Sequence, residues 1–312
     1  MKLIRYLPKE PAFPQGCVLT IGNFDGVHAG HRMVLNSLIK QAKSSNLQSV
    51  VMCFEPQPIE YFRAQAAPAR ISTARDKIEQ LRQTGVDATY LVSFSDVLAN
   101  MTAEQFVKML VEQLNIKLLI VGDDFCFGKN RQGDFDYLLS AGKTYGFSVQ
   151  RSASFKLDNK RVSSTIIRQA LEKGQLDKVA VYLNRSFSMS GRVMHGHKRG
   201  RELGFPTANI RVKNRKTPLK GVFAVTITLE AGLLYQGVAN LGTRPSIEDK
   251  AAVLLEAHLF DFSGDLYGQR VTVEFKKKLR EEKKFDNLEQ LTQQISLDAS
   301  HAKTYFNQLP TS

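Results

Sequence analysis

The stretch CVLTIGNFDGVHAGHRMVLNSLIKQAKSS, residues 17–45, decides the fold of the first half of the chain. It opens with CVLTIG, an apolar run of the length of a β-strand. After a short loop, apolar residues recur at helical spacing between Met33 and Ile39. A strand that leads through a glycine-rich loop into a helix is the unit from which parallel α/β sheets are built.

The same alternation continues along the chain. Further apolar runs of strand length lie at 49–56, 87–94 and 117–125, and the segments 74–85 and 102–115 have the pattern of helices. Short apolar strands separated by helices predict a parallel sheet that is covered on both faces. Ligands of such sheets bind at the carboxyl ends of the strands. We therefore expect a Rossmann-like first domain.

The residues after 188 have a different character. Short β-rich runs are separated by Gly, Asn, Asp and Pro, at residues 188–196, 221–230, 233–242, 253–262 and 270–279. This pattern predicts an antiparallel β-barrel. Asp286 followed by Glu289 resembles a capping box, which predicts a closing helix. The fold class is thus α/β followed by mainly β, and the junction near LNRSFSM divides the chain into domains 1–183 and 184–312.

Composition limits the environment and the partners. The chain has 312 residues and a formal net charge of +13, and the charge is shared between the two halves. Its three cysteines lack the spacing of a disulfide framework or a zinc site. We find neither a secretory signal nor an apolar run of membrane-spanning length, so we expect a cytoplasmic protein without a membrane partner. The oligomeric state cannot be read from the sequence.

The first motif, at residues 21–31, favours a phosphate ligand. Gly22 and Gly30 permit close approach of the backbone, and His28 and His31 stand at the entry to the predicted helix. A helix N-terminus presents unpaired N–H groups to an anion, and imidazoles beside it can donate to phosphate oxygens. The alternative is that the two histidines only cap the helix.

A second helix start lies at RVSSTIIR, residues 161–168. Ser163, Ser164 and Thr165 supply hydroxyl groups, and Arg168 follows in the first turns of the helix. Capping needs only one of these hydroxyls. The motif therefore suggests further contacts to phosphate.

The barrel half contains a glycine-rich basic stretch that ends in PTAN, residues 206–209. Thr207 and Asn209 are two residues apart, so an extended segment points both side chains to the same side. Their hard oxygen atoms suit Mg²⁺, which keeps most of its shell for water and substrate phosphates. The alternative is a bend in which both side chains bond only to their own backbone.

One carboxylate stands out in an apolar strand of the barrel half, at Glu256 in LLEAHLF. An unpaired buried carboxylate is costly, so it must be exposed, paired or retained for chemistry. The alternative is an ordinary surface position on an alternating strand. His258, two residues further on, is expected to share its face.

These motifs together resemble a known family. GNFDGVHAGH, VGDDFCFGKNRQGD and RVSSTIIR resemble, in this order, the adenylyltransferase domain of bacterial bifunctional riboflavin kinase/FAD synthetases. The second half resembles their riboflavin kinase domain in SGRVMHGHKRGRELGFPTANI, KGVFAV, GVANLGTRPS, LLEAHLFDF and LREEKKF. The resemblance spans nearly the whole chain.

The resemblance implies two reactions with ATP: phosphorylation of riboflavin to FMN in the barrel, and adenylylation of FMN to FAD in the first domain. In the first domain it implies that His28 and His31 stabilise the phosphates. ATP would be bound there by Gly22, Phe24, Gly30, Asp124, Ser163, Ser164, Thr165 and Arg168, and flavin by Phe54 and Phe125. For Phe125 and Phe127, packing in the core is an open alternative.

In the second domain the resemblance implies that Glu256 is the general base and that Thr207 and Asn209 hold Mg²⁺. ATP would be bound by Gly191, Gly196, Gly200, Arg201 and Thr207, and flavin by Arg280, Glu282 and Phe285. Phe223 and Ser246 depart from the family pattern, in which tyrosine and threonine are usual. The partners implied are the small molecules ATP, riboflavin and FMN, with Mg²⁺ as cofactor and no nucleic acid.

Three other functions remain to be distinguished. A class I aminoacyl-tRNA synthetase also uses a helix start of this type, but this chain lacks an obvious anticodon domain. A second alternative is a barrel that binds flavin without catalysis and regulates the first domain. The basic charge would also suit an RNA-binding module, whose binding falls steeply with salt.

Overall fold

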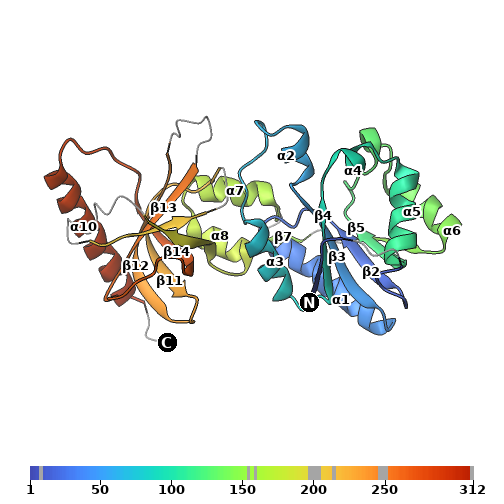
Figure 1. Cartoon of the computed structure of the whole chain (residues 1–312), viewed down its shortest axis with the longest axis horizontal. Helices are drawn as coiled ribbons and strands as arrows, with labels where there is room; N and C mark the ends of the chain where they lie inside the picture. Colours follow the sequence, from blue (N-terminus) through green and yellow to red (C-terminus); the bar gives the residue numbers. More distant parts are fainter. Residues whose placement is uncertain are drawn as a thin grey trace. The chain divides into compact units, whose positions relative to one another are not determined.

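A computed structural model of the chain (Figure 1) describes residues 1–6, 10–152, 155–157, 160–195, 205–212, 216–244 and 252–309. These residues form two compact units. The first unit comprises Met1–Ala67 and Lys77–Val162, and the second comprises Pro68–Asp76 and Ser163–Ser312. The sequence predicted the boundary between the domains at 183/184, which assigns the helices between 163 and 183 to the first domain. The compact units place these helices with the barrel instead. The domain boundary itself stays a prediction.

A parallel six-stranded sheet forms the first unit, with the strand order β1-β4-β3-β2-β5-β6. Its strands are β1 (Lys2–Ile4), β2 (Cys17–Ile21), β3 (Gln48–Glu55), β4 (Ala88–Ser93), β5 (Ile116–Val121) and β6 (Ser148–Arg151). Its helices are α1 (Ala29–Ser44), α2 (Pro58–Phe62), α3 (Ala74–Arg82), α4 (Asp96–Asn100), α5 (Ala103–Leu114), a 3₁₀ turn η1 (Lys129–Arg131) and α6 (Phe135–Tyr145), with α3 running across the division between the units. The short strands β7 (Lys156–Leu157) and β8 (Lys160–Arg161) pair with each other.

Both faces of this sheet are buried, as the continuous apolar strands predict. Leu19 of β2 packs with Phe106 and Leu110 of α5 on one face, whereas its neighbour Val18 packs with Leu35 of α1 on the other. Successive side chains of a strand alternate between the two sides of a sheet. A strand with helices on both sides therefore has no polar face.

The strand order reverses its direction at β2. The chain runs from β2 through β3 to β4 on one side, and β5 then pairs with β2 on its other side. A crevice forms at such a reversal, outside the carboxyl ends of the two strands. The segments that leave these ends begin at Gly22 and Gly122, which follow Ile21 and Val121.

A closed antiparallel barrel forms the core of the second unit, with the order β10-β13-β12-β11-β14-β9. Its strands are β9 (Phe187–Met194), β10 (Ala208–Arg211), β11 (Gly221–Leu229), β12 (Leu234–Arg244), β13 (Ala252–Leu259) and β14 (Arg270–Arg280). The helices α7 (Ser164–Glu172) and α8 (Leu176–Leu183) precede it, and α8 contacts β9 and β14. The predicted single helical stretch thus breaks near Gly174, which has a φ of +65°.

A C-terminal helix, α10 (Leu288–Asn307), lies against the outside of the barrel (Figure 1). Its residues Ala299, Ala302 and Phe306 pack with Ala224 and Phe260. The predicted cap is wrong by one residue: Asn287, not Asp286, accepts the hydrogen bond from the backbone of the first turn, at Gln290 N. Asparagine caps a helix as well as aspartate does, so both residues fitted the pattern.

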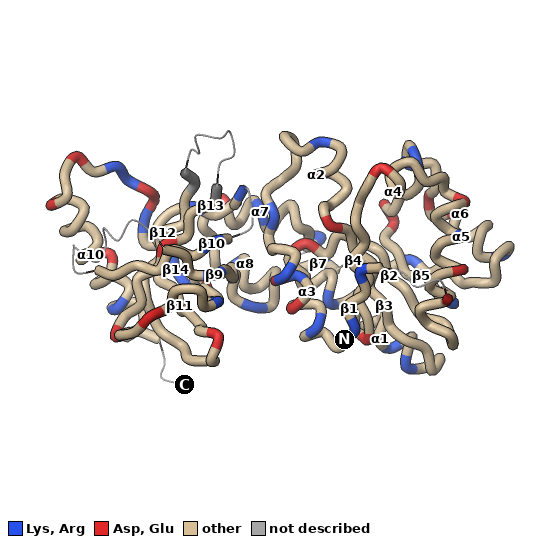
Figure 2. The backbone as a smooth tube through the Cα atoms, viewed as in Figure 1, with Lys and Arg blue, Asp and Glu red and all other residues tan. Residues whose placement is uncertain are grey.

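Charged residues of both signs are interspersed along each unit (Figure 2). The net positive charge is therefore not gathered in one tail. Among the residues that the structure describes, none of the helices is both long enough and apolar enough to cross a bilayer.

Candidate active sites

The loop after β2 has a strained backbone. Phe24 and Val27 have φ values of +48° and +39°, and Gly26 between them has a φ of +81°. Positive φ is rare for side chains other than glycine, above all for β-branched ones, and such strain gathers at functional sites. Burial holds the loop in place, since Phe24 is 3% and Val27 0% exposed. The loop delivers the chain to the start of α1.

His28 caps α1 with its own ring. Its Nδ1 accepts a hydrogen bond of 3.3 Å from His31 N, so the capping alternative describes this atom correctly. An acceptor at Nδ1 requires the proton of the neutral ring to be on Nε2. The cap therefore fixes the tautomer that makes Nε2 a hydrogen-bond donor, which is what a phosphate oxygen requires.

The two histidines stack on each other. Their ring centroids are 3.6 Å apart at an interplanar angle of 19°, and Phe24 packs on His31 from 5.0 Å. Burial, and then the electrostatic interactions with His28 and Lys77, hold the pKa of His31 well below its ordinary value of 6.5. His31 is thus neutral at neutral pH. Its Nδ1 is buried and has no hydrogen-bond partner among the described residues.

Gly30 packs tightly against its neighbours at the start of α1. A Cβ there would meet the His28 ring at 3.1 Å and the Val162 carbonyl at 3.3 Å. At Gly22, a Cβ would lie 3.2 Å from the Phe24 ring. Both glycines therefore allow the close packing on which the loop depends, beyond any contact with a nucleotide.

The second predicted helix start belongs to the other compact unit. Ser163 is the N-cap of α7, yet its side chain accepts no hydrogen bond from the first turn, all of which is described. Arg168 Nε donates a hydrogen bond of 2.6 Å to the carbonyl of Ala69, within the same unit. Ser164 and Thr165 form the start of α7. His28 and His31 belong to the first unit.

A partly exposed aromatic cluster lies at the carboxyl ends of β3 and β4. Phe94 has ring contacts with Phe54 at 5.7 Å, Tyr61 at 5.3 Å and Phe62 at 5.6 Å. Phe62 is 62% exposed, which is unusual for so large an apolar ring. Of these residues, only Phe54 was predicted from the sequence, as a flavin-binding residue. The cluster could have been suspected from the aromatic residues that follow two successive apolar strands.

Asp124 and Phe125, which follow β5, differ in their surroundings. Phe125 stacks on Phe127 at 5.6 Å, and Phe127 in turn packs on Phe106 of α5. These rings extend the core beneath the sheet, as the packing alternative holds. The Asp124 side chain is 82% exposed and lies 4.0 Å from that of Arg161.

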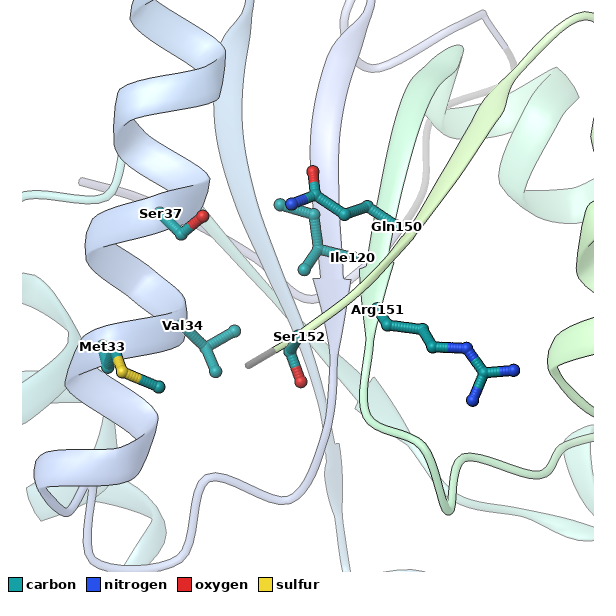
Figure 3. A pocket seen from close by; sticks show the side chains of 7 residues that line it. All are labelled: Met33, Val34, Ser37, Ile120, Gln150, Arg151 and Ser152. Atoms are coloured by element: carbon teal, nitrogen blue, oxygen red, sulfur yellow. The ribbon is translucent and has the colours of Figure 1, made fainter. Parts of the chain in front are cut away.

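Figure 3 shows a pocket of about 100 Å³ between α1 and the ends of β5 and β6. The residues that line it are Met33, Val34, Ser37, Ile120, Gln150, Arg151 and Ser152. None of them was named from the sequence. Pockets that enclose whole ligands have roughly 300 Å³ or more, so this pocket suits one part of a molecule.

In the barrel, strand register brings the predicted base and a predicted metal ligand together. Asn209 of β10 pairs directly with Glu256 of β13, and Glu256 pairs on its other side with Asn240 of β12. Directly opposed residues share one face of a sheet, with Cβ atoms about 4.5–5.5 Å apart. Their neighbours Leu255 and Ala257 are fully buried. Asn209, Glu256 and Asn240 therefore form a polar row on the outer face of the barrel.

His258 connects this row to the PTAN segment. Its Nδ1 lies 2.9 Å from the carbonyl oxygen of Pro206, and its ring packs edge-on against Phe205 at 5.5 Å. The contact fixes the backbone one residue before Thr207, whose side chain is exposed at the start of β10. Of the other predicted kinase residues, Gly196, Gly200 and Arg201 lie outside the described residues.

The packing of the barrel explains why residue 191 is a glycine. A Cβ at this position would meet the carbonyl oxygen of Arg211 at 2.6 Å, on the adjacent strand β10. The close approach of β9 and β10 requires a glycine there. A contact of Gly191 with ATP stays a prediction.

The three predicted flavin residues of the barrel lie at the end of β14 and just after it. Arg280 is held by Asp298 of α10 through its Nε at 2.9 Å and its terminal nitrogen at 2.7 Å. The Glu282 carboxylate lies so close to Gly242 that a Cβ there would collide with it. Phe285 lies with its ring 5.8 Å from the Arg280 guanidinium. Asp298, which the sequence analysis missed, thus orients Arg280.

Comparison with known proteins identifies the family. The FAD synthetase family matches residues 10–166, and the riboflavin kinase family matches residues 183–306. The bifunctional riboflavin kinase/FMN adenylyltransferase of Haemophilus influenzae is 47% identical over 308 residues, which cover 98% of this chain and 100% of the relative. The chain belongs to the bifunctional riboflavin kinase/FMN adenylyltransferase family. The Escherichia coli member is 44% identical over 308 residues, 98% of each chain.

One solved structure matches this chain over nearly its whole length. It is described as a macrolide-efflux protein from Streptococcus pneumoniae, is 28% identical and has a TM-score of 0.80, with 97% of this chain and 99% of that chain covered. The resemblance inferred from the motifs is confirmed, including the order of the two domains. The fold class, a parallel sheet followed by an antiparallel barrel with a closing helix, is confirmed as well.

Phe223, one of the two departures from the family pattern, is packed in the core of the barrel. Phe223 is 0% exposed and makes an edge-on contact with Phe275 at 5.3 Å inside the barrel. A tyrosine there would have to bury its hydroxyl beside this ring and find it a partner. The second departure, Ser246, lies outside the described residues.

Proposed function

We propose that this member of the bifunctional riboflavin kinase/FMN adenylyltransferase family phosphorylates riboflavin in its barrel and adenylylates the resulting FMN in its α/β domain. ATP is the donor in both reactions. The observation that carries the proposal is the polar row of the barrel, where Asn209 and Glu256 are direct cross-strand neighbours. A metal ligand and a general base are required within reach of one phosphoryl transfer.

In the kinase reaction, Glu256 accepts the proton of the terminal ribityl hydroxyl of riboflavin. The hydroxyl oxygen then forms a bond to the γ-phosphorus of ATP, the bond between the γ-phosphorus and the β,γ-bridging oxygen breaks, and ADP leaves. His258 holds the Pro206 carbonyl at 2.9 Å and thereby helps to keep Asn209 beside Glu256. Gly191, Gly196, Gly200 and Arg201 are the residues proposed to bind ATP.

The donor set of the barrel fits Mg²⁺. Thr207 offers a hydroxyl at the exposed start of β10, and Asn209 offers an amide oxygen on the same face, beside a carboxylate. Few protein oxygen atoms and open access for water and phosphate are what Mg²⁺ prefers. Bound there, the ion neutralises charge on the ATP phosphates.

In the adenylyl transfer, an FMN phosphate oxygen attacks the α-phosphorus of ATP and pyrophosphate leaves, without a covalent enzyme intermediate. His28 Nε2 donates a hydrogen bond to the phosphate oxygens as their charge grows. The neutral His31 supports the ring of His28 from 3.6 Å. Ser163, Ser164, Thr165 and Arg168 hold the triphosphate, and the uncapped hydroxyl of Ser163 supports this role.

FMN binds on the partly exposed aromatic cluster of the α/β domain. Phe62 and Phe94 offer apolar rings to the flavin, and the buried Phe54 supports Phe94, at the carboxyl edge where parallel sheets bind ligands. In the barrel, Arg280, Glu282 and Phe285 contact riboflavin, with Arg280 oriented by Asp298. The nucleotide of the first site lies near Gly22, Phe24, Gly30 and Asp124.

The cytoplasm is the proposed location, and ATP and flavins are the proposed partners. Cys17 and Cys53 are buried free thiols, which suits a reducing compartment. The basic charge then serves anionic substrates, not nucleic acid.

The stoichiometry of the products tests the function. Protein supplied with riboflavin, ATP and Mg²⁺ should release one ADP for each FMN or FAD molecule that accumulates, and one pyrophosphate for each FAD. Supplied with FMN in place of riboflavin, it should release pyrophosphate alone. Pyrophosphate exchange that requires an amino acid would instead support a synthetase, and salt-sensitive RNA binding without ATP would support a nucleic-acid module.

A further inference from the structure

A lysine is fully buried in the α/β domain. Lys77 of α3 is 1% exposed and is among the largest side chains that the fold buries completely. Removing an ammonium group from water costs several kcal/mol, by order of magnitude, unless nearby groups compensate for the loss. A position that only fills space would hold leucine or methionine at no such cost. Lys77 therefore calls for a specific reason.

The contact of this ammonium is with the strained loop. Lys77 Nζ donates a hydrogen bond of 3.2 Å to the carbonyl oxygen of Asn23, although the two residues are 54 positions apart. Phe24 follows Asn23 directly and Val27 lies four residues after it, and their positive φ values cost about 1–3 kcal/mol each. Such a conformation persists only where the surroundings impose it.

The rest of α3 supports the same loop through apolar contacts. Ile78 and Leu81 belong to the core cluster that also contains Phe24 and Val27. The helix thus holds the loop in two ways: apolar side chains pack against its rings and methyl groups, and one ammonium holds its backbone.

The charge of Lys77 also reaches the histidines. It contributes, after burial and the interaction with His28, to the lowered pKa of His31. Charges in a buried site are screened less than charges at the surface. The ammonium that holds the Asn23 carbonyl thus also acts on the ring that stacks on His28.

We propose that Lys77 is a positioning residue of the adenylyl transfer: its ammonium fixes the Asn23 carbonyl, and with it the strained loop that presents His28 and His31 to ATP. The inference rests on the proposed function and adds a residue to it. Lys77 acts through the loop and its histidines, not through the flavin cluster. Its removal should therefore reduce kcat for FAD formation and leave KM for FMN nearly unchanged.

Two matched variants test the proposal in the full-length protein. Lys77→Met removes the cation and keeps the length of the side chain. Gln80→Met removes a second polar group of α3, 8% exposed, whose Oε1 is buried without a hydrogen-bond partner in the described chain. We expect kcat of Lys77→Met with FMN and ATP to fall at least about tenfold. Gln80→Met should retain the wild-type value.

Two further readouts separate the outcomes. Cys17, buried at 0% exposure in the same domain, should resist thiol reagents in both variants if the domain stays folded. Wild-type kcat in Lys77→Met, an equal loss in Gln80→Met, or exposure of Cys17 in Lys77→Met alone would each overturn the proposal. Failure of the wild type to form FAD would instead refute the proposed function itself.

Discussion

The ion pair between Arg280 and Asp298 joins the last barrel strand to α10. The Asp298 side chain is 4% exposed, and its carboxylate receives hydrogen bonds from two nitrogens of the guanidinium. Removing one partner of a buried pair leaves the other charge without compensation, which costs about 3–5 kcal/mol. We predict that Asp298→Asn lowers the free energy of unfolding of the barrel by about 3 kcal/mol, measured by urea denaturation.

A second pair nearby provides the control. Lys278 and Glu281 also form an ion pair, but the Glu281 side chain is 77% exposed. Exposed pairs contribute about 0–1 kcal/mol, so Glu281→Gln should leave the unfolding curve almost unchanged. Equal effects of the two substitutions would contradict the assignment of Asp298.

Cysteine reactivity gives a second prediction for single residues. Burial raises the pKa of Cys17 to about 12 and also raises that of Cys53, so both remain protonated at about pH 8. Cys126 is only partly buried. Iodoacetamide should therefore label only Cys126 in the native protein at this pH, and all three cysteines after unfolding, as counted by mass spectrometry. Rapid native labelling of Cys17 would show that its domain opens.

At the scale of the elements, two helices that both have a hydroxyl residue at the N-cap should respond differently when that residue is substituted. Thr102 caps α5 in a complete capping box with Gln105, with hydrogen bonds of 3.2 and 2.9 Å. Thr102→Ala should cost about 1 kcal/mol of stability. Ser163 of α7 makes no such bond to the described first turn, so Ser163→Ala should leave the melting temperature unchanged. It should instead raise KM for ATP in FAD formation.

Calorimetry and steady-state kinetics on the two variants separate these effects. A lower melting temperature of Ser163→Ala with unchanged KM for ATP would assign this hydroxyl to the helix and not to the ligand. The pair thus distinguishes a structural cap from a binding group by two independent measurements.

Apolar periodicity predicted β2 to β5 and the helices α1, α3 and α5 of the first unit, whereas β1, β6, α2, α4 and α6 were not predicted. The segments 74–85 and 102–115 correspond to α3 (Ala74–Arg82) and α5 (Ala103–Leu114), because both helices keep one apolar stripe. The grouping of α7 and α8 with the barrel could not be predicted, because it depends on tertiary packing against β9 and β14. β10 was foreseen only as an extended segment because it has four residues.

The candidate sites were predictable only in part, for a similar reason. The motifs themselves draw attention to five residues, because their types suit phosphate or metal chemistry: His28, His31, Thr207, Asn209 and Glu256. The position of Asn240 beside Glu256 could not be predicted from the sequence, because strand pairing is set by the whole barrel. Lys77 resembles any solvent-exposed lysine of a helix, and Asp298 resembles any polar residue of α10. Only burial in the folded protein distinguishes them.

At the scale of the whole molecule, one polypeptide carries two separate groups of candidate catalytic residues. The stacked histidines belong to the parallel-sheet unit, and the polar row around Glu256 belongs to the barrel. The stacking of His28 on His31 and the pairing of Glu256 with Asn209 each depend on contacts within one unit. The account therefore predicts that the two reactions can be abolished one at a time.

Product analysis of two variants tests this most directly. Wild-type protein, His28→Ala and Glu256→Ala are incubated with riboflavin, ATP and Mg²⁺, and the flavins are separated by chromatography. We predict FMN and FAD from the wild type, FMN alone from His28→Ala, and no product from Glu256→Ala unless FMN is supplied, when FAD should form. Riboflavin left untouched by the wild type while supplied FMN becomes FAD, or loss of both reactions in either variant, would contradict the account.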